Sequence, residues 1–161
     1  MKMSVEIIPS VLVKTREEFE ERVRLVEGHY ESVQMDVCDG IFVQNKTLDG
    51  FVEVEATESD LKFGIHLMVS KPENHIARWA KLENVNEICF HVEATSKHRE
   101  VIKAIQDAEL SLGIVINPST AWKEIESFVD LLDFVQFMTV EPGFNGAPFV
   151  PSVLEKIADF H

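Results

Sequence analysis

The chain has 161 residues, 45% of them hydrophobic, and 28 acidic against 15 basic residues give a formal charge of −13. This length and apolar content predict one domain, residues 1–161, with a real core. The acidic balance argues against nucleic-acid or anionic-membrane partners, which need clustered Lys and Arg, and no run approaches the roughly 20 apolar residues of a membrane helix. Cys38 and Cys89 sit in apolar runs without CxxC spacing, which predicts buried free thiols in a cytoplasmic protein.

Short β-branched runs alternate with amphipathic runs, a pattern typical of repeated βα units around a parallel sheet. The predicted strands cover residues 5–8, 32–37, 63–67, 87–91, 112–116 and 134–138. Six helices are predicted between and after these strands. The first ends at Glu27 and has Thr15 as its N-cap, the second is weak and lies within 51–59, and the third begins at Pro72. The fourth covers 96–108, the fifth is capped by Ser119 or Thr120, and the sixth covers 151–160.

Two architectures can hold six such units. An open doubly wound sheet expects a glycine-rich turn directly after its first strand. Residues 8–10 read Ile-Pro-Ser, and no glycine occurs before Gly28. A (β/α)8 barrel needs about 250 residues and eight units. We therefore predict a TIM-type α/β barrel that is incomplete: six units are present, strands seven and eight are missing, and the chain stops inside a helical pattern at His161.

Polar residues follow every predicted strand, at the end where barrel enzymes carry their active sites. They are Ser10, Asp36, Asp39, His66, Met68 (a thioether), His91, Glu93, Asn117, Thr139 and Glu141. Asp36 and His66 differ from the others because they lie within the apolar runs, where an unpaired polar group is costly. Two adjacent strands that each deliver one metal-binding side chain predict a shared site.

The loop over residues 141–146 reads Glu-Pro-Gly-Phe-Asn-Gly and lies between the sixth strand and the last helix. Glycines let backbone N–H groups approach an anion closely, and a helix N-terminus adds a favourable dipole. Such a loop alone is weak evidence, and a plain turn explains it as well. Beside Asp36 and His66 it predicts a phosphate-binding loop.

Several motifs, in this order along the chain, resemble the ribulose-phosphate 3-epimerase family. They are Ile-Pro-Ser at 8–10, Met-Asp-Val-Cys-Asp-Gly at 35–40, His-Leu-Met-Val at 66–69, Phe-His-Val-Glu at 90–93 and Met-Thr-Val-Glu-Pro-Gly-Phe at 138–144. Members of this family are (β/α)8 barrels that interconvert ribulose 5-phosphate and xylulose 5-phosphate with one divalent metal ion. The resemblance implies that one aspartate takes the C3 proton and another returns a proton on the opposite face.

Carried over residue by residue, the resemblance implies that Asp36 is an acid/base and a metal ligand and that His66 is a second ligand. It implies substrate contacts by Ser10, His66 and Met68, and phosphate contacts by Gly143, Phe144, Asn145 and Gly146. The metal could be Zn, Fe, Mn, Co or Mg. The substrate would be a phosphorylated ketose, and homo-oligomers are a possible assembly.

Three departures from the family pattern limit these expectations. Gln34 stands where the family has a histidine ligand, and an amide is a poor ligand for zinc or iron, which favours Mg²⁺ or Mn²⁺. Residues 42–45 read Phe-Val-Gln-Asn instead of Phe-Val-Pro-Asn, and Asn145 and Ala147 replace residues common in the phosphate loop. The second catalytic aspartate is expected beyond His161, so we predict that the 161-residue chain is itself inactive.

Three other functions compete with the pentulose-phosphate epimerase. A ketohexose-6-phosphate 3-epimerase of the same family differs only in substrate length. A non-catalytic sugar-phosphate-binding barrel relic would explain Gln34 by loss of the metal. A barrel decarboxylase related to orotidine monophosphate decarboxylase would need a lysine between the carboxylates of strand two, where Val37 and Cys38 stand.

Overall fold

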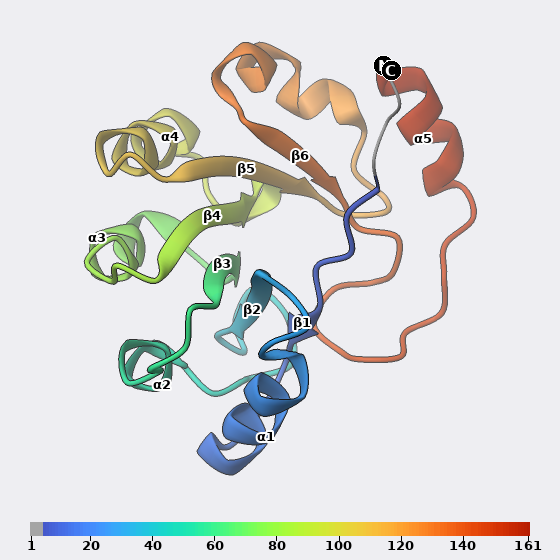
Figure 1. Cartoon of the computed structure of the whole chain (residues 1–161). Coiled ribbons are helices and arrows are strands. Elements are labelled where there is room, and N and C mark those ends of the chain that lie inside the picture. Colours follow the sequence, from blue (N-terminus) through green and yellow to red (C-terminus); the bar gives the residue numbers. More distant parts are fainter. Residues whose placement is uncertain (1–4) are drawn as a thin grey trace.

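The computed structural model describes residues 5–161 and contains six parallel strands in sequence order. The strands are β1 (Ser10–Val11), β2 (Ser32–Cys38), β3 (Lys62–Met68), β4 (Val85–His91), β5 (Ser111–Ile116) and β6 (Phe134–Phe137). The sheet curls, and helices cover its outer side (Figure 1). Consecutive parallel order with inward curl is the start of a TIM-type barrel, and it excludes the doubly wound alternative.

The helices are α1 (Arg16–Val26), α2 (Phe51–Glu55), α3 (Ile76–Trp79), α4 (His98–Asp107) and α5 (Val153–Phe160), with 3-10 turns η1 (Pro72–Asn74), η2 (Val92–Ala94) and η3 (Trp122–Leu131). The predicted N-cap of α1 is confirmed, because Thr15 Oγ1 accepts the backbone N–H of Glu18 at 3.2 Å. Helix α4 buries Val101, Ile102 and Ile105 against the sheet.

The core lies between the sheet and these helices, and the central strands supply most of it. In β3, every residue from Phe63 to Met68 is buried, as expected for a parallel strand covered on both faces. Trp79 of α3 and Phe63 are fully enclosed. This packing makes β2, β3 and β4 a rigid base for the side chains at their carboxyl ends.

The prediction of a first strand over residues 5–8 is wrong. Those residues are coil, and pairing with β2 covers only Ser10 and Val11. In this register the next hydrogen bond toward the N-terminus would be donated by the N–H of residue 9 to Ser32. Pro9 has no N–H, so the ladder stops there. The apolar pattern of residues 5–8 instead gives exposed side chains such as Val5 and Ile7.

Two helix predictions also need correction. The segment after Pro72 is not one helix but the turn η1 followed by the short α3. The segment predicted to be capped by Ser119 or Thr120 is the 3-10 helix η3, whose cap residue Ala121 makes no side-chain cap bond. The Thr120 hydroxyl is engaged elsewhere, since it donates to Glu93.

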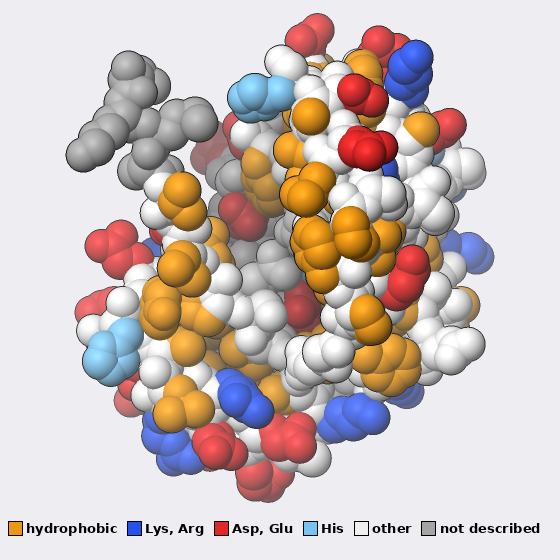
Figure 2. Space-filling view, turned by 90° about the vertical axis from the view of Figure 1, so that its right-hand side faces the viewer, with side chains coloured by type: hydrophobic (Ala, Val, Ile, Leu, Met, Phe, Trp, Pro, Cys, Tyr) orange, Lys and Arg blue, Asp and Glu red, His pale blue; other side chains and the backbone are white. Residues whose placement is uncertain are grey.

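One side of the molecule is hollowed, and hydrophobic side chains line both walls of the hollow (Figure 2). The segments that border it are the N-terminal coil, the loop from β6 and helix α5. Exposed hydrophobic residues on these segments are Val5, Ile7, Ile8, Phe144, Phe149 and Leu154. Within residues 5–161, no helix is long and apolar enough to cross a membrane.

Candidate active site

All side chains and loop residues predicted for the site line one cavity of about 240 Å³ at the carboxyl ends of the strands. Strands and their ends contribute Ser10, Gln34, Asp36, His66 and Met68, and the loop after β6 contributes Gly143, Phe144, Asn145 and Gly146. Sequence positions more than 130 residues apart therefore meet at one place.

Asp36 and His66 lie side by side on β2 and β3, because the register pairs these two residues directly. The Asp36 Oδ1 and His66 Nδ1 atoms are 2.8 Å apart, and both residues are buried. Gln34, two residues before Asp36 on the same face of β2, donates from Nε2 to Asp36 Oδ1 at 2.8 Å. Its amide nitrogen also lies 3.3 Å from His66 Nδ1. Three polar side chains thus converge at the buried end of the cavity.

A second buried histidine continues this cluster. His91, at the end of β4, has its Nε2 atom 2.9 Å from His66 Nε2, and the two rings stack at an interplanar angle of 20°. Its Nδ1 atom faces Glu93 Oε2 at 3.5 Å, and Phe42 packs on the ring at 4.9 Å between centroids. Burial lowers the pKa of His91 below its usual value.

Glu93 is held by the next strand. Its Oε1 atom accepts the backbone N–H of Asn117 at 2.9 Å and the hydroxyl of Thr120. Burial alone would raise the pKa of Glu93, but the nearby His91 ring and the hydrogen bonds from the Thr120 hydroxyl and the Asn117 N–H outweigh burial and lower the pKa to about 2. The carboxylate is therefore ionised at neutral pH, behind two histidines that are buried.

The loop after β6 reaches across to the first strands. Asn45 is buried, and its Nδ2 atom donates to the Gly143 carbonyl at 2.7 Å. Gly143 has φ +107°, and a Cβ there would lie 3.1 Å from Val43. Within residues 5–161, the N–H groups of residues 144–146 donate to no other backbone group. Helix α5 begins only at Val153, so coil separates its N-terminus from this loop in the sequence.

Asp39, the other carboxylate of the second strand motif, does not line the cavity. Its Oδ1 atom accepts the N–H groups of Ile41 and Phe42 at 2.8 and 2.9 Å, and Oδ2 accepts the N–H of Ser70 at 2.7 Å. These bonds fix the loop after β2 and tie it to the loop after β3. Asp39 therefore stabilises the loops next to the cavity.

Sequence reasoning missed part of the lining. Gln136, Met138 and Val140 face the cavity from β6 and the residues after it, and Leu12, the residue after β1, also lines it. Residues 136, 138 and 140 alternate, which is the signal of one strand face, but the pattern alone does not say that this face points inward. With Met68, Met138 gives the cavity an apolar wall.

The two cysteines are buried and free, as predicted. Cys38 lies next to the cluster, with its sulfur 4.0 Å from that of Met68. Burial, with smaller contributions from the charges of Asp36 and Asp39, raises the pKa of the Cys38 thiol to about 12. Burial also raises the pKa of Cys89. Both are packing residues and unsuited to act as thiolates near neutral pH.

The residues present fit a divalent ion only in part. Asp36 Oδ1 and His66 Nδ1 are atom types that coordinate divalent ions, and they lie next to each other beside the Gln34 amide. Among the described residues, no group of three or more His, Cys, Asp and Glu side chains is arranged to hold a metal. An ion here would have two protein ligands of ordinary strength and would complete its coordination with water, the Gln34 oxygen or substrate.

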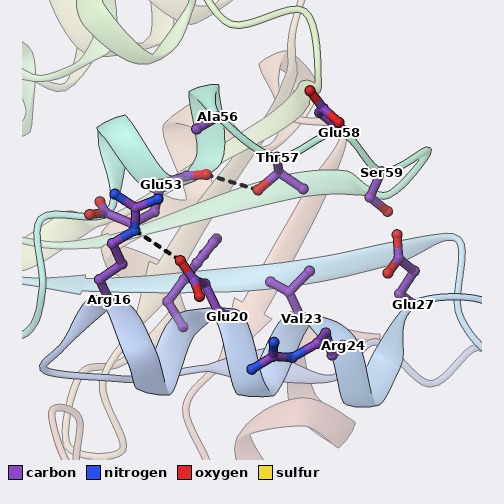
Figure 3. Close-up of a pocket in the computed structure, with 11 residues that line it drawn as sticks. Arg16, Glu20, Val23, Arg24, Glu27, Glu53, Ala56, Thr57, Glu58 and Ser59 are labelled. Carbon is purple, nitrogen blue, oxygen red and sulfur yellow. Dashed lines mark hydrogen bonds and ion pairs between the residues drawn. The ribbon is translucent and has the colours of Figure 1, made fainter.

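A second hollow, of about 330 Å³, lies outside the sheet (Figure 3). Helix α1 forms one side of it, and α2 with residues 56–59 forms the other. Among its lining residues, Arg16 Nε contacts Glu20 Oε1 at 2.9 Å, and Thr57 Oγ1 donates to the Glu53 backbone carbonyl at 2.8 Å. None of its charged residues is buried, so this groove lacks the buried ionisable side chains of the first cavity.

A curled parallel sheet with buried ionisable side chains at its carboxyl ends is the arrangement of (β/α)-barrel enzymes, and this chain has six such strands. A sequence profile described as the Ribulose-phosphate 3 epimerase family matches residues 6–161. The ribulose-phosphate 3-epimerase of Bacillus subtilis is 35% identical over 158 residues, which cover 96% of this chain and 72% of the relative. That of Schizosaccharomyces pombe is 35% identical over 161 residues, with 96% and 70% covered.

The chloroplastic ribulose-5-phosphate-3-epimerase of Arabidopsis thaliana is 34% identical over 164 residues, covering 98% of this chain and 57% of the relative. The chain belongs to the ribulose-phosphate 3-epimerase family, whose members are carbohydrate epimerases of the isomerase class. The resemblance expected from the sequence motifs is confirmed.

Proposed function

We propose that the cavity binds a phosphorylated ketose and that Asp36 moves the proton at C3, in the interconversion of ribulose 5-phosphate and xylulose 5-phosphate. The observation that carries the proposal is the placement of a buried carboxylate, a buried imidazole and a glycine loop around one small cavity. A volume of about 240 Å³ is below the roughly 300–1,000 Å³ of sites for drug-sized ligands, which suits a small metabolite.

The residues divide by chemistry. The free N–H groups of residues 144–146 would bind the phosphate, since fixed backbone donors suit an anion. Ser10 would hold a substrate hydroxyl, and Met68 and Met138 would keep water from the reacting carbon. Asp36 would accept the C3 proton. A divalent ion held by Asp36 and His66 would supply Lewis-acid stabilisation of the charge that develops on the substrate oxygens.

Inversion of one carbon needs a proton donor on the face opposite the base. Among residues 5–161, Asp36 is the carboxylate at the buried end of the cavity, and Glu141 lines it from an exposed position. We therefore propose that this chain by itself removes and returns the proton on one face, with little or no epimerisation. Two further βα units on the free edges of β1 and β6 would supply the second acid.

The test is to incubate the chain with ribulose 5-phosphate in D2O and follow C3 by proton NMR. We expect slow deuterium exchange at C3 without accumulation of xylulose 5-phosphate, and loss of exchange in Asp36→Asn. Asp49→Asn is the matched control, because Asp49 is exposed and pairs with Arg78 outside the cavity. Rapid epimerisation would overturn the single-base proposal, and absence of both exchange and substrate binding would overturn the function.

A non-catalytic sugar-phosphate-binding relic is the second candidate, and Gln34 favours it. The Gln34 amide donates to Asp36 and lies beside His66, where it competes with a metal ion. The relic would bind the sugar phosphate, retain no divalent ion under saturating Mn²⁺ and give no exchange at C3. Exchange that depends on Asp36 excludes it.

A further inference from the structure

The loop after β6 is fixed to the first strands mainly through one residue, Gly143. Gly143 is buried, whereas the three residues after it are exposed. Its carbonyl accepts a 2.7 Å hydrogen bond from Asn45 Nδ2, and Asn45 is only 5% exposed. The Val43 side chain packs against Gly143, where a Cβ would lie 3.1 Å from Val43 Cβ. A second contact, from Asn145 Nδ2 to the Leu12 carbonyl, is longer at 3.4 Å.

The segment after β2 that carries Asn45 is itself held in place. The Thr47 N–H donates to the Cys38 carbonyl at 3.1 Å, and the Cys38 N–H donates to Thr47 Oγ1 at 2.9 Å, so the two ends of the segment are joined. Asp39 accepts two backbone N–H groups from within the same segment. Because its own segment is fixed, Asn45 sets the position of the Gly143 carbonyl.

The Gly143 carbonyl and the Phe144 N–H belong to one peptide unit, which is planar and trans. In such a unit the C=O and N–H bonds point in opposite directions. The bond from Asn45 therefore directs the Phe144 N–H away from the segment after β2. Gly143 and Phe144 both line the cavity, and within residues 5–161 the Phe144 N–H donates to no other backbone group.

Without Asn45 this peptide unit could turn over. Gly143 has φ +107° and no Cβ, so a rotation that exchanges the directions of the C=O and the N–H meets little steric resistance. The turned unit would offer an anion a carbonyl oxygen, which repels it, in place of an N–H. Among residues 5–161, the cavity lining contains no Lys or Arg and includes the carboxylates of Asp36 and Glu141. An anion there depends on N–H and O–H donors, and hence on their orientation.

We infer that Asn45 is a positioning residue that fixes the Gly143–Phe144 peptide unit so that its N–H, and not its C=O, faces a phosphate group in the cavity. The inference rests on the proposed function, which places a sugar phosphate there. Asn45 does not itself line the cavity, so it acts on the ligand only through the loop.

NMR titration of the ¹⁵N-labelled chain with ribulose 5-phosphate observes this N–H directly. We expect the Phe144 amide proton to move strongly downfield as the ligand saturates, because a hydrogen bond to an ionised acceptor is short and strong. The same titration gives the dissociation constant. It needs no substitution, so it does not depend on a variant that folds.

Two variants measure the contribution of Asn45. Asn45→Leu removes the donor, is of similar size and adds no charge. Its affinity for ribulose 5-phosphate should fall about tenfold to a hundredfold, the range for a lost hydrogen bond to a charged group. At saturation the Phe144 amide should no longer move, while the Ser10 amide at the other side of the cavity still does. This second readout separates a change of orientation from a general loss of stability.

Asn84→Leu is the matched control. Asn84 Nδ2 also donates to a backbone carbonyl, that of Val54, at 2.7 Å, but neither residue lines the cavity. This variant loses the same kind of hydrogen bond, and its affinity for ribulose 5-phosphate and its Phe144 shift should equal those of the original chain.

The outcomes distinguish a failure of this inference from a failure of the proposed function. The inference is wrong, and the proposed function stands, if ribulose 5-phosphate binds without moving the Phe144 amide. The same holds if the two leucine variants lose equal affinity, or if Asn45→Leu keeps the full Phe144 shift at saturation. If the original chain does not bind ribulose 5-phosphate, the proposed function fails and the inference fails with it.

Discussion

Removal of the Asp39 carboxylate should destabilise the chain far more than expected for a residue that is only partly buried. Asp39→Ala leaves three backbone N–H groups, those of Ile41, Phe42 and Ser70, without their acceptor. A hydrogen bond to a charged group contributes about 1.5–3 kcal/mol. Partial exposure to solvent reduces that value, so we use about 1 kcal/mol for each bond and expect a loss of about 3 kcal/mol. For a chain of this size that is about 6–12 °C in melting temperature.

Urea unfolding followed by circular dichroism measures this loss. The stability of Asp39→Asn should lie between that of the original chain and that of Asp39→Ala. The asparagine Oδ1 would still accept two N–H groups, but its amide nitrogen would face the Ser70 N–H. Asp49→Ala is the control, since it removes the ion pair between Asp49 and Arg78. The Asp49 side chain is 58% exposed, so this ion pair is worth at most about 1 kcal/mol. Equal stability of Asp39→Ala and Asp49→Ala would refute the reasoning.

Three other predictions concern acid stability, packing and metal affinity. The pKa of Glu93 falls from 4.5 to about 2 on folding, so its contribution to the free energy of unfolding is complete above pH 4.5 and disappears as the pH falls toward 2. Glu93→Gln should therefore flatten the pH dependence of the unfolding free energy in this window by up to about 3 kcal/mol. An unchanged pH profile would contradict this prediction. Gly50→Ala should lower the free energy of unfolding, measured in urea, more than Gly28→Ala does. Both glycines have positive φ, but only a Cβ at Gly50 would lie 2.4 Å from a Met35 side-chain atom. Equal losses of stability would mean that only the backbone conformation matters. Gln34→His should raise Zn²⁺ affinity about tenfold or more by equilibrium dialysis, since imidazole is a better zinc ligand than an amide, and unchanged affinity would show that position 34 does not reach the ion.

The sequence was most informative where a local rule decides the structure. Asp36 and His66 were found because ionisable groups inside apolar strands are costly, and parallel strands bring their carboxyl ends together. The N-cap Thr15 follows from one hydrogen bond within its own turn. The first strand failed because its end is decided by a missing donor at Pro9 in a register that the sequence does not state.

The parts that sequence could not predict depend on contacts between distant segments. In the sequence, His91 and Glu93 are separate polar residues at the end of the fourth strand. The contact of His91 with His66, which bonds to Asp36, exists only because three strands align. Gln136 and Met138 alternate along β6, but which face points inward depends on the curl of the whole sheet. The prediction that Ser119 or Thr120 caps a helix was wrong: the cap residue is Ala121, and the Thr120 hydroxyl donates to Glu93.

The bond from Asn45 to the Gly143 carbonyl joins residues 98 positions apart, whereas Asp36 and His66 on neighbouring strands are 30 apart. Loop-closure entropy grows with chain length, and contacts of high sequence separation form late. We therefore expect the strands to assemble progressively and the loop over residues 141–146 to dock last. In refolding, the ability to hold a ligand should lag behind the recovery of secondary structure, and in native-state hydrogen exchange this loop should open before the sheet does.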